Sequence, residues 1–165
     1  MQDKPDVLKG PIVRLFGKLS EWVGLSDNVA PAAAALFLER YGDEERLGSD
    51  DICEVTGYSR ANAGLIISQL EALGVVSGQR DYEQTGRGRK RLLYKMETDI
   101  DSFVSLGIQR IADLLKSMLK DIDAIEQQYG EDDKRLAKMM RDLRNAIERN
   151  LASLQGLPAM RSTTT

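Results

Sequence analysis

The sequence contains no histidine among its 165 residues and a single cysteine, Cys53. Without histidine, the chain lacks the Ser-His-Asp and Cys-His pairs of many hydrolases and the histidine ligands of most zinc sites. One cysteine excludes an intrachain disulfide, so we expect a reducing cytoplasm as the setting. These two absences predict a protein that is not an enzyme and that needs no metal or other cofactor.

Long apolar runs are also lacking. The longest, at about residues 30–38, is roughly half of the ~20 residues that a membrane-spanning helix needs, so we expect no membrane partner. Hydrophobic residues make up 42% of the chain and charged residues 30%, which supplies a core and argues against disorder. The composition therefore predicts a globular cytoplasmic protein.

The net charge of −3 argues, taken alone, against binding to nucleic acid. Its distribution argues the other way. Residues 57–95 contain seven Lys and Arg and three Asp and Glu, so this segment carries +4 and the rest of the chain −7. Most of the positive charge lies in residues 86–91, where glycine alternates with arginine before two further basic residues. A solvated loop that is basic by chance is the alternative interpretation.

Helical periodicity dominates the first half of the chain. Apolar residues recur three and four apart over residues 7–25, which predicts an amphipathic helix. A second helix is expected from Ser26 or Asp27 to about Tyr41. Ser49 is the expected N-cap of a short third helix over residues 50–55.

A turn at residues 57–59 leads to a fourth helix, for which Ser59 is the expected N-cap and which ends near Leu73. Residues 75–76 and 91–96 are predicted strands, joined by a glycine-rich loop over residues 78–90. Helix, short helix, turn, helix and hairpin, in this order, are typical of a winged helix-turn-helix domain.

The C-terminal part predicts two long helices, over about residues 98–129 and 132–154, each with a sustained apolar seam. One interpretation is a dimer interface, and the other is an antiparallel pair that folds back within the chain. We favour dimerisation. The predicted interface residues are Val104, Ile108, Ile111, Leu115, Met118, Ile122, Ile125, Met140, Leu143 and Ile147.

The stretch from Ser59 to Val76 resembles the recognition helix and the start of the wing in the MarR superfamily. Within it, Ser59-Arg60-Ala61-Asn62 and Leu70-Glu71-Ala72-Leu73-Gly74-Val75-Val76 are most similar to the GbsR-type regulators. The N-terminal helix, with Gly17 and Trp22, and the long C-terminal helices also fit that layout. The resemblance implies a homodimeric transcriptional regulator, often a repressor, that binds a double-stranded DNA operator with two recognition helices.

The resemblance also assigns residues. The core of the winged domain would contain Ala63, Ile67 and Leu70. The DNA groove would be faced by Ser59, Arg60, Ala61, Asn62, Gly64, Leu65 and Ser68. The wing would contact the DNA backbone or minor groove through Arg80, Arg87, Arg89, Lys90 and Arg91.

Few polar residues lie on the presumed reading face. Arg pairs with guanine and Asn with adenine, each for about 1–3 kcal/mol of discrimination, so shape readout by the wing can matter as much. Gly64, in mid-helix, permits either close approach to DNA or packing against another helix. Some members of the family that the chain resembles respond to choline-like effectors. Phe16, Trp22, Phe37 and Tyr41 could line such a pocket, although core packing explains them more simply.

The prediction is a mainly α fold with a small β-hairpin. Residues 1–26 form an N-terminal packing and dimerisation helix, 27–97 the winged helix-turn-helix domain, 98–156 the C-terminal dimerisation region and 157–165 a flexible tail. The predicted function is a sequence-specific DNA-binding regulator, and a small-molecule effector of unknown identity is left open as a further partner. The alternative is a winged-helix module that binds a protein of the transcription machinery and has no specific DNA binding of its own.

Overall fold

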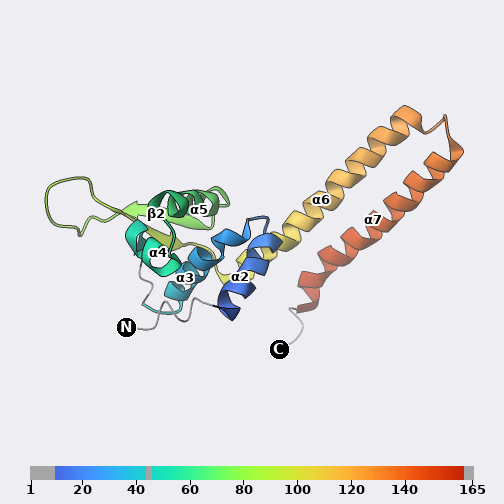
Figure 1. The fold of residues 1–165 in the computed structure, drawn as a ribbon. Helices are drawn as coiled ribbons and strands as arrows, with labels where there is room; N and C mark the ends of the chain where they lie inside the picture. Colours follow the sequence, from blue (N-terminus) through green and yellow to red (C-terminus); the bar gives the residue numbers. More distant parts are fainter. Residues whose placement is uncertain (1–9, 44–45, 162–165) are drawn as a thin grey trace. The chain divides into compact units, whose positions relative to one another are not determined.

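The structure is a computed structural model that describes residues 10–43 and 46–161, with side chains through residue 156. It is mostly helical with one small antiparallel sheet, as predicted (Figure 1). The elements are α2 (Pro11–Trp22), the 3-10 helix η1 (Asp27–Val29), α3 (Ala30–Arg40), β1 (Leu47–Gly48), α4 (Ser49–Thr56), α5 (Arg60–Ala72), β2 (Val76–Arg80), β3 (Leu92–Met96), α6 (Ile100–Tyr129) and α7 (Lys134–Arg161).

The chain divides into two compact units, Met1–Ser105 and Leu106–Thr165. The division falls within α6, so the first turns of this helix belong to the N-terminal unit. That unit contains α2, the helix-turn-helix elements and the sheet. The predicted N-terminal helix therefore shares a compact unit with the predicted winged domain.

The core of the N-terminal unit forms around α3. Four consecutive alanines, Ala32–Ala35, are almost completely buried, and their small side chains let neighbouring elements approach closely. Phe37 on the same helix contacts Phe103 edge-on at a ring-centroid distance of 5.1 Å and Phe16 at 6.0 Å. The indole Nε1 of Trp22 donates to the carbonyl oxygen of Val104 at 2.9 Å.

These contacts bear on the aromatic pocket considered from the sequence. Phe16, Trp22 and Phe37 are engaged in packing or hydrogen bonding within the unit, whereas Tyr41 is 75% exposed. The four side chains therefore do not converge on one cavity. Core packing, the simpler interpretation, accounts for the first three.

The sheet has the order β1-β3-β2, with both neighbouring pairs antiparallel. The hairpin of β2 and β3 was predicted, but β1 was not, because a two-residue strand is too short to show alternation. Leu47 of β1 and Gly78 of β2 both pair with Tyr94 of β3. Since β2 extends to Arg80, the loop of the wing spans residues 81–91 and is shorter than predicted.

Two helix caps fix the turn between α4 and α5. Gly57 ends α4 at φ +74°, a left-handed conformation that favours glycine. The hydroxyl of Ser59 accepts a hydrogen bond from the backbone N–H of Asn62 at 3.2 Å, so the predicted N-cap of α5 is confirmed. Ser49 is not the N-cap of α4. That helix begins after Gly48, whose N–H donates to the Asp51 carboxylate at 2.8 Å.

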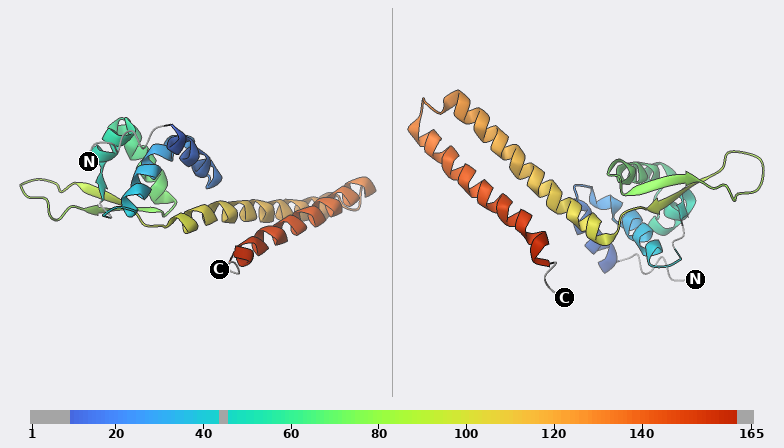
Figure 2. Two further views of the ribbon diagram at one scale, coloured as in Figure 1. Left: turned by 90° about the horizontal axis from the view of Figure 1, so that it is seen from below. Right: turned by 180° about the vertical axis from the view of Figure 1, so that it is seen from behind.

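In the C-terminal unit, α6 and α7 run side by side in opposite directions in every view (Figures 1 and 2). Arg144 of α7 contacts Asp123 at 2.6 Å and Glu126 at 2.8 Å on α6. These two carboxylates raise the pKa of Arg144, chiefly through the hydrogen bond with Asp123. The apolar seam contains the buried side chains of Ile122 and Met140.

The last helix is longer than predicted. The helix α7 runs on to Arg161, beyond the expected end near residue 154. Pro158 removes one backbone donor, but the fixed φ of proline is close to the helical value. Residues 162–165 of the predicted tail lie outside the described residues.

Candidate nucleic-acid interface

One face of α5 is open to solvent and the opposite face is buried. The buried side includes Ala63, Ile67 and Leu70, the three predicted core residues, together with Ile66. Of the predicted groove-facing residues, Asn62 is half-buried and the others are exposed. These exposed residues are Ser59, Arg60, Ala61, Gly64, Leu65 and Ser68.

Gly64 lies in the middle of this exposed face. A Cβ built at this position would meet no described atom within 4 Å apart from its own helix backbone. The glycine therefore makes no close packing contact with a neighbouring helix, which was one of its two predicted roles. Leu65, next to it, is 66% exposed.

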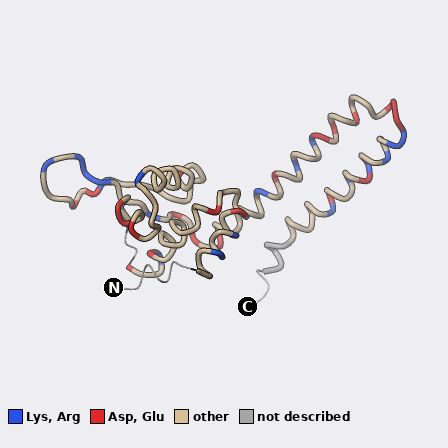
Figure 3. Tube along the Cα trace, in the orientation of Figure 1, with Lys and Arg blue, Asp and Glu red and all other residues tan. Residues whose placement is uncertain are grey.

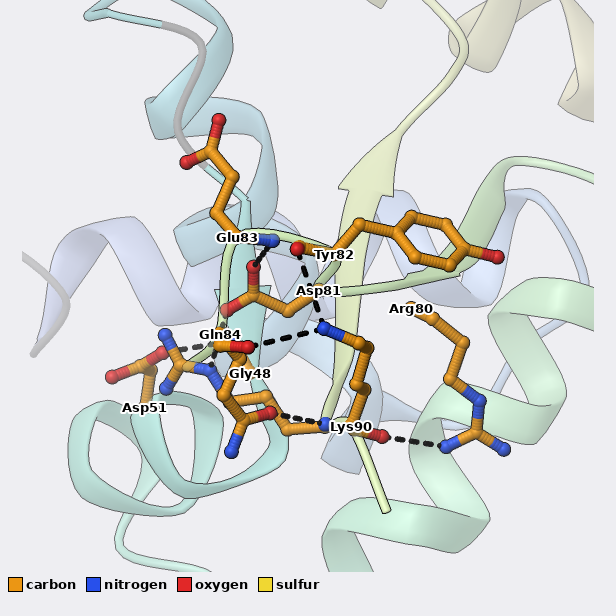
Figure 4. Close-up of polar contacts among 9 residues, drawn as sticks. Gly48, Asp51, Arg80, Asp81, Tyr82, Glu83, Gln84 and Lys90 are labelled. Atoms are coloured by element: carbon orange, nitrogen blue, oxygen red, sulfur yellow. Dashed lines mark hydrogen bonds and ion pairs between the residues drawn. The ribbon is translucent and has the colours of Figure 1, made fainter. Parts of the chain in front are cut away.

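The loop of the wing is held by its own hydrogen bonds (Figure 4). The N–H of Asp81 donates to the carbonyl of Arg91 at 2.9 Å, and the N–H of Arg91 donates to Oε1 of Gln84 at 2.8 Å. The ammonium group of Lys90 donates to the carbonyl oxygens of Gln84 at 3.1 Å and Tyr82 at 3.3 Å. The side chain of Lys90, close to the end of the loop, is thus hydrogen-bonded to the backbone of Tyr82 and Gln84 at its start.

Two further wing cations also have partners inside the domain. Arg80 donates from Nη1 to the carbonyl of Lys90 at 2.8 Å, and Arg91 forms an ion pair with Asp81 at 3.4 Å. Arg87 and Arg89 differ, because the described part of the chain offers neither of them a hydrogen bond or an ion pair. Both are exposed, and each lies beside a glycine with positive φ, Gly86 at +113° and Gly88 at +122°.

The base of the wing and the first turns of α4 and α5 enclose a groove of about 550 Å³. Five of its lining residues are basic, and a single acidic residue, Asp50, lies among them. The basic residues of the groove are Arg60, Arg80, Arg89, Lys90 and Arg91. Figure 3 shows the same concentration of basic residues along the extended loop, with acidic residues on α4 close by.

Chemically, this arrangement suits a polyanion. Guanidinium and ammonium groups form charge-assisted hydrogen bonds with phosphate oxygens, and guanidinium groups do so in a bidentate manner. The exposed face of α5 adjoins the groove at Arg60, and a DNA major groove is wide enough to admit an α-helix. No group of three or more His, Cys, Asp or Glu that could hold a metal ion is found among the described residues.

Sequence reasoning missed Asp50 as part of this site. The pair Asp50-Asp51 is explained at sequence level as favourable negative charge at a helix N-terminus. Only the second aspartate accepts a hydrogen bond from the N-cap residue, whereas Asp50 forms an ion pair with Arg60 at 3.0 Å. The spacing of ten residues between the partners has no local signal, because it depends on how α4 and α5 cross.

The predicted dimer residues are distributed unevenly. Ile122 and Met140 are buried within the C-terminal unit, whereas Met118 is 39% and Leu143 44% exposed. The remaining predicted seam residues are half-buried: Val104, Ile108, Ile111, Leu115, Ile125 and Ile147. Two largely apolar grooves, of about 510 Å³ on α7 and about 370 Å³ between α6 and α7, are present on this unit.

No helix in the described part of the chain is both long enough and apolar enough to cross a membrane. No protein-family model matches the sequence, and neither does any curated protein. The structure is similar to a crystal structure of a transcriptional regulator, with a TM-score of 0.57 and 12% sequence identity over 93% of this chain and 97% of that chain. The chain therefore shares its fold with that structure.

Proposed function

We propose that this protein is a sequence-specific double-stranded DNA-binding transcriptional regulator. The observation that carries the proposal is the juxtaposition of an exposed α5 face with a groove that contains five basic residues. A polar helix face next to a basic hairpin matches the two contacts of a winged helix-turn-helix domain, one to base edges and one to the backbone. The likeness to a transcriptional regulator supports the proposal at the level of the fold.

In this proposal, the N-terminal half of α5 enters the major groove. Arg60 and Asn62 are the residues that can read guanine and adenine through paired hydrogen bonds. The exposed Leu65 side chain suits contact with a thymine methyl group, which explains why a large apolar residue is left in water in the free protein. Ser59 and Ser68 at the edges of this face can donate to phosphate oxygens.

The wing would contact the backbone or minor groove through Arg87 and Arg89, the two loop cations without partners in the described chain. Arg80, Lys90 and Arg91 would contribute positive charge while they hold the loop in shape. The remainder of the chain is acidic and would discourage binding by any other face. Operator recognition would therefore be confined to one edge of the molecule.

We also propose that the regulator is a homodimer. The exposed apolar side chains of α6 and α7, among them Leu114, Met118, Met139 and Leu143, support this proposal because a monomer gains nothing from leaving them in water. A second copy would cover them and would place two recognition helices at a fixed spacing. A cytoplasmic repressor of the GbsR branch of the MarR superfamily is the finer assignment that the Ser59–Val76 stretch supports.

The proposal is tested by selecting bound duplexes from a random pool with purified protein. We expect an enriched motif with two related half-sites, and affinity for it that falls steeply with added salt as phosphate contacts release counterions. A pool without enrichment, at low salt, contradicts specific DNA binding. Such a result would favour the alternative of a winged-helix module that binds another protein.

A further inference from the structure

The first turns of α4 and α5 are joined by an ion pair between Asp50 and Arg60. Oδ1 of Asp50 lies 3.0 Å from Nη2 of Arg60, and the side chains are 71% and 83% exposed. Exposed pairs of this kind contribute little to stability, because water solvates both charges well and ordering two side chains costs entropy. The stability of the fold does not explain why these two side chains meet.

Capping of α4 does not require Asp50 either. The carboxylate of Asp51 accepts a hydrogen bond from the N–H of Gly48, the N-cap residue, at 2.8 Å and thereby satisfies that backbone donor. Arg60 is the first residue of α5, where the positive end of the helix dipole disfavours a cation. The carboxylate of Asp50 lies at the favourable N-terminal end of α4 and, in addition, pairs with the guanidinium of Arg60 at the end of α5.

This pair lies where DNA would bind. Asp50 is the acidic residue of the groove that also contains Arg80, Arg89, Lys90 and Arg91. A backbone phosphate that enters the groove meets four other cations and, beside Arg60, one carboxylate that repels it. Any duplex that offers Arg60 nothing more than a phosphate must compete with Asp50 for the guanidinium.

We propose that Asp50 is a specificity-determining residue that restrains Arg60 from indiscriminate contacts with phosphate; this proposal rests on the DNA-binding function proposed above. A guanidinium has five N–H donors, so Arg60 can keep one bond to Asp50 and direct the others to O6 and N7 of guanine. The carboxylate then fixes the plane of the guanidinium on the correct base. On other sequences the same carboxylate weakens binding.

The test compares Asp50→Asn with the wild type on the selected duplex and on a scrambled duplex of equal length, over a salt series. We expect Asp50→Asn to strengthen binding to the scrambled duplex about three- to tenfold, as a freed guanidinium gains a phosphate contact and the salt slope steepens by about 0.9 for each bound protomer. Affinity for the selected duplex should change less than about twofold, so the specificity ratio falls. Asp50→Glu should restore most of the ratio.

Asp51→Asn is the matched control, because it removes the same charge from the neighbouring position while an amide oxygen can still accept the N–H of Gly48. It should leave the specificity ratio near that of the wild type. In an Arg60→Ala background, Asp50→Asn should no longer alter the ratio. Circular dichroism and urea unfolding verify that each variant is folded.

An unchanged ratio in Asp50→Asn overturns the role of Asp50. So does an equal drop in Asp51→Asn, which would reduce the effect to net charge, or a drop that persists without Arg60. These outcomes differ from failure of the proposed function, in which the wild-type protein itself enriches no duplex. In that case the proposal on Asp50 falls with it.

Discussion

Gly78 and Tyr94 face each other across β2 and β3, and the tyrosine ring lies where a side chain at position 78 would be. A Cβ on Gly78 would be 2.9 Å from Cε1 of Tyr94, closer than Cβ atoms approach other atoms in proteins, and 3.1 Å from Cδ1, which is tighter than most such contacts. Tyr94 is only 8% exposed and pairs with Leu47 on its other side, so its ring has little room to move. This contact lies at the base of the wing.

Gly78→Ala should therefore destabilise the protein. The methyl group must displace a confined ring or bend the hairpin, and overpacking of this kind costs about 1–3 kcal/mol. Urea unfolding measures the change in the free energy of unfolding. Unaltered stability would mean that the Tyr94 ring moves aside at no cost, which contradicts its confinement between β1 and β2.

Gly64→Ala should instead raise the free energy of unfolding. Position 64 has free space around a Cβ, and exchanging glycine for alanine within a helix stabilises it by about 0.8–1.0 kcal/mol. If the exposed face of α5 contacts DNA closely, the same methyl group should weaken binding to the selected duplex. A rise in Tm together with lower DNA affinity would support that close approach, and unchanged affinity would contradict it.

The basic residues of the wing should fall into two classes, those that contact phosphate and those that keep the loop ordered. Arg87→Ala combined with Arg89→Ala should weaken binding to every duplex and reduce the salt slope by about 2 for each bound protomer, since each lost phosphate contact removes about 0.9. Lys90→Ala should instead release the carbonyls of Tyr82 and Gln84, and amide exchange in the loop should become faster.

The contrary result would be a Lys90→Ala variant with an ordered loop and a salt slope reduced by about 0.9 per protomer, half of the reduction in the double variant. Lys90 would then be a phosphate contact in its own right. Its hydrogen bonds within the loop would not be what keeps the loop ordered. Arg80→Ala provides a second comparison, because Arg80 donates to the carbonyl of Lys90 in the same way.

The features that could be predicted from the sequence are those that depend on residues close together along the chain. Helical periodicity located every long helix, and the Ser59 cap followed from a serine placed directly before a helical segment. The core positions Ala63, Ile67 and Leu70 followed from the resemblance to a known recognition helix. The classification as a mainly α fold with a small sheet needed no further information.

What the sequence did not show depends on contacts between distant residues. The strand β1 exists because Leu47 and Gly48 find partners on β3, and two residues have no period of their own. Which wing cations hydrogen-bond within the loop, and which remain available to contact DNA, depends on the carbonyl oxygens that lie near each side chain in the folded loop. A local pattern cannot distinguish Lys90 from Arg89, although they are adjacent and both basic.

Ser49, the first residue of α4, and Ser59, the residue before α5, give a direct test of capping. Ser59→Ala removes the acceptor for the N–H of Asn62 and should cost about 1 kcal/mol, whereas Ser49→Ala should be nearly neutral because Gly48 and Asp51 form the cap of α4. Urea unfolding of the two variants measures the difference. Equal losses would contradict the assignment of the cap to Gly48.

Met118 and Leu143 allow the homodimer to be tested without disrupting the fold. Both side chains are partly in water in the single chain, at 39% and 44% exposure, so a charge at either position is tolerable in a monomer. In a dimer that buries the α6 and α7 seam, the same charge would be buried without a partner, which is strongly destabilising. The two states therefore respond differently to the same substitution.

We expect the wild-type protein to sediment as a dimer at micromolar concentration, and Met118→Glu combined with Leu143→Glu to shift it to a monomer with intact helical content. Gln127→Glu combined with Gln128→Glu adds the same charge at two exposed positions of α6 and should leave the dimer intact. A wild-type monomer would contradict the homodimer. A Met118→Glu and Leu143→Glu variant that stays dimeric would move the interface elsewhere on the chain, and the exposed apolar residues Ile12 and Leu15 of α2 would be the next positions to substitute.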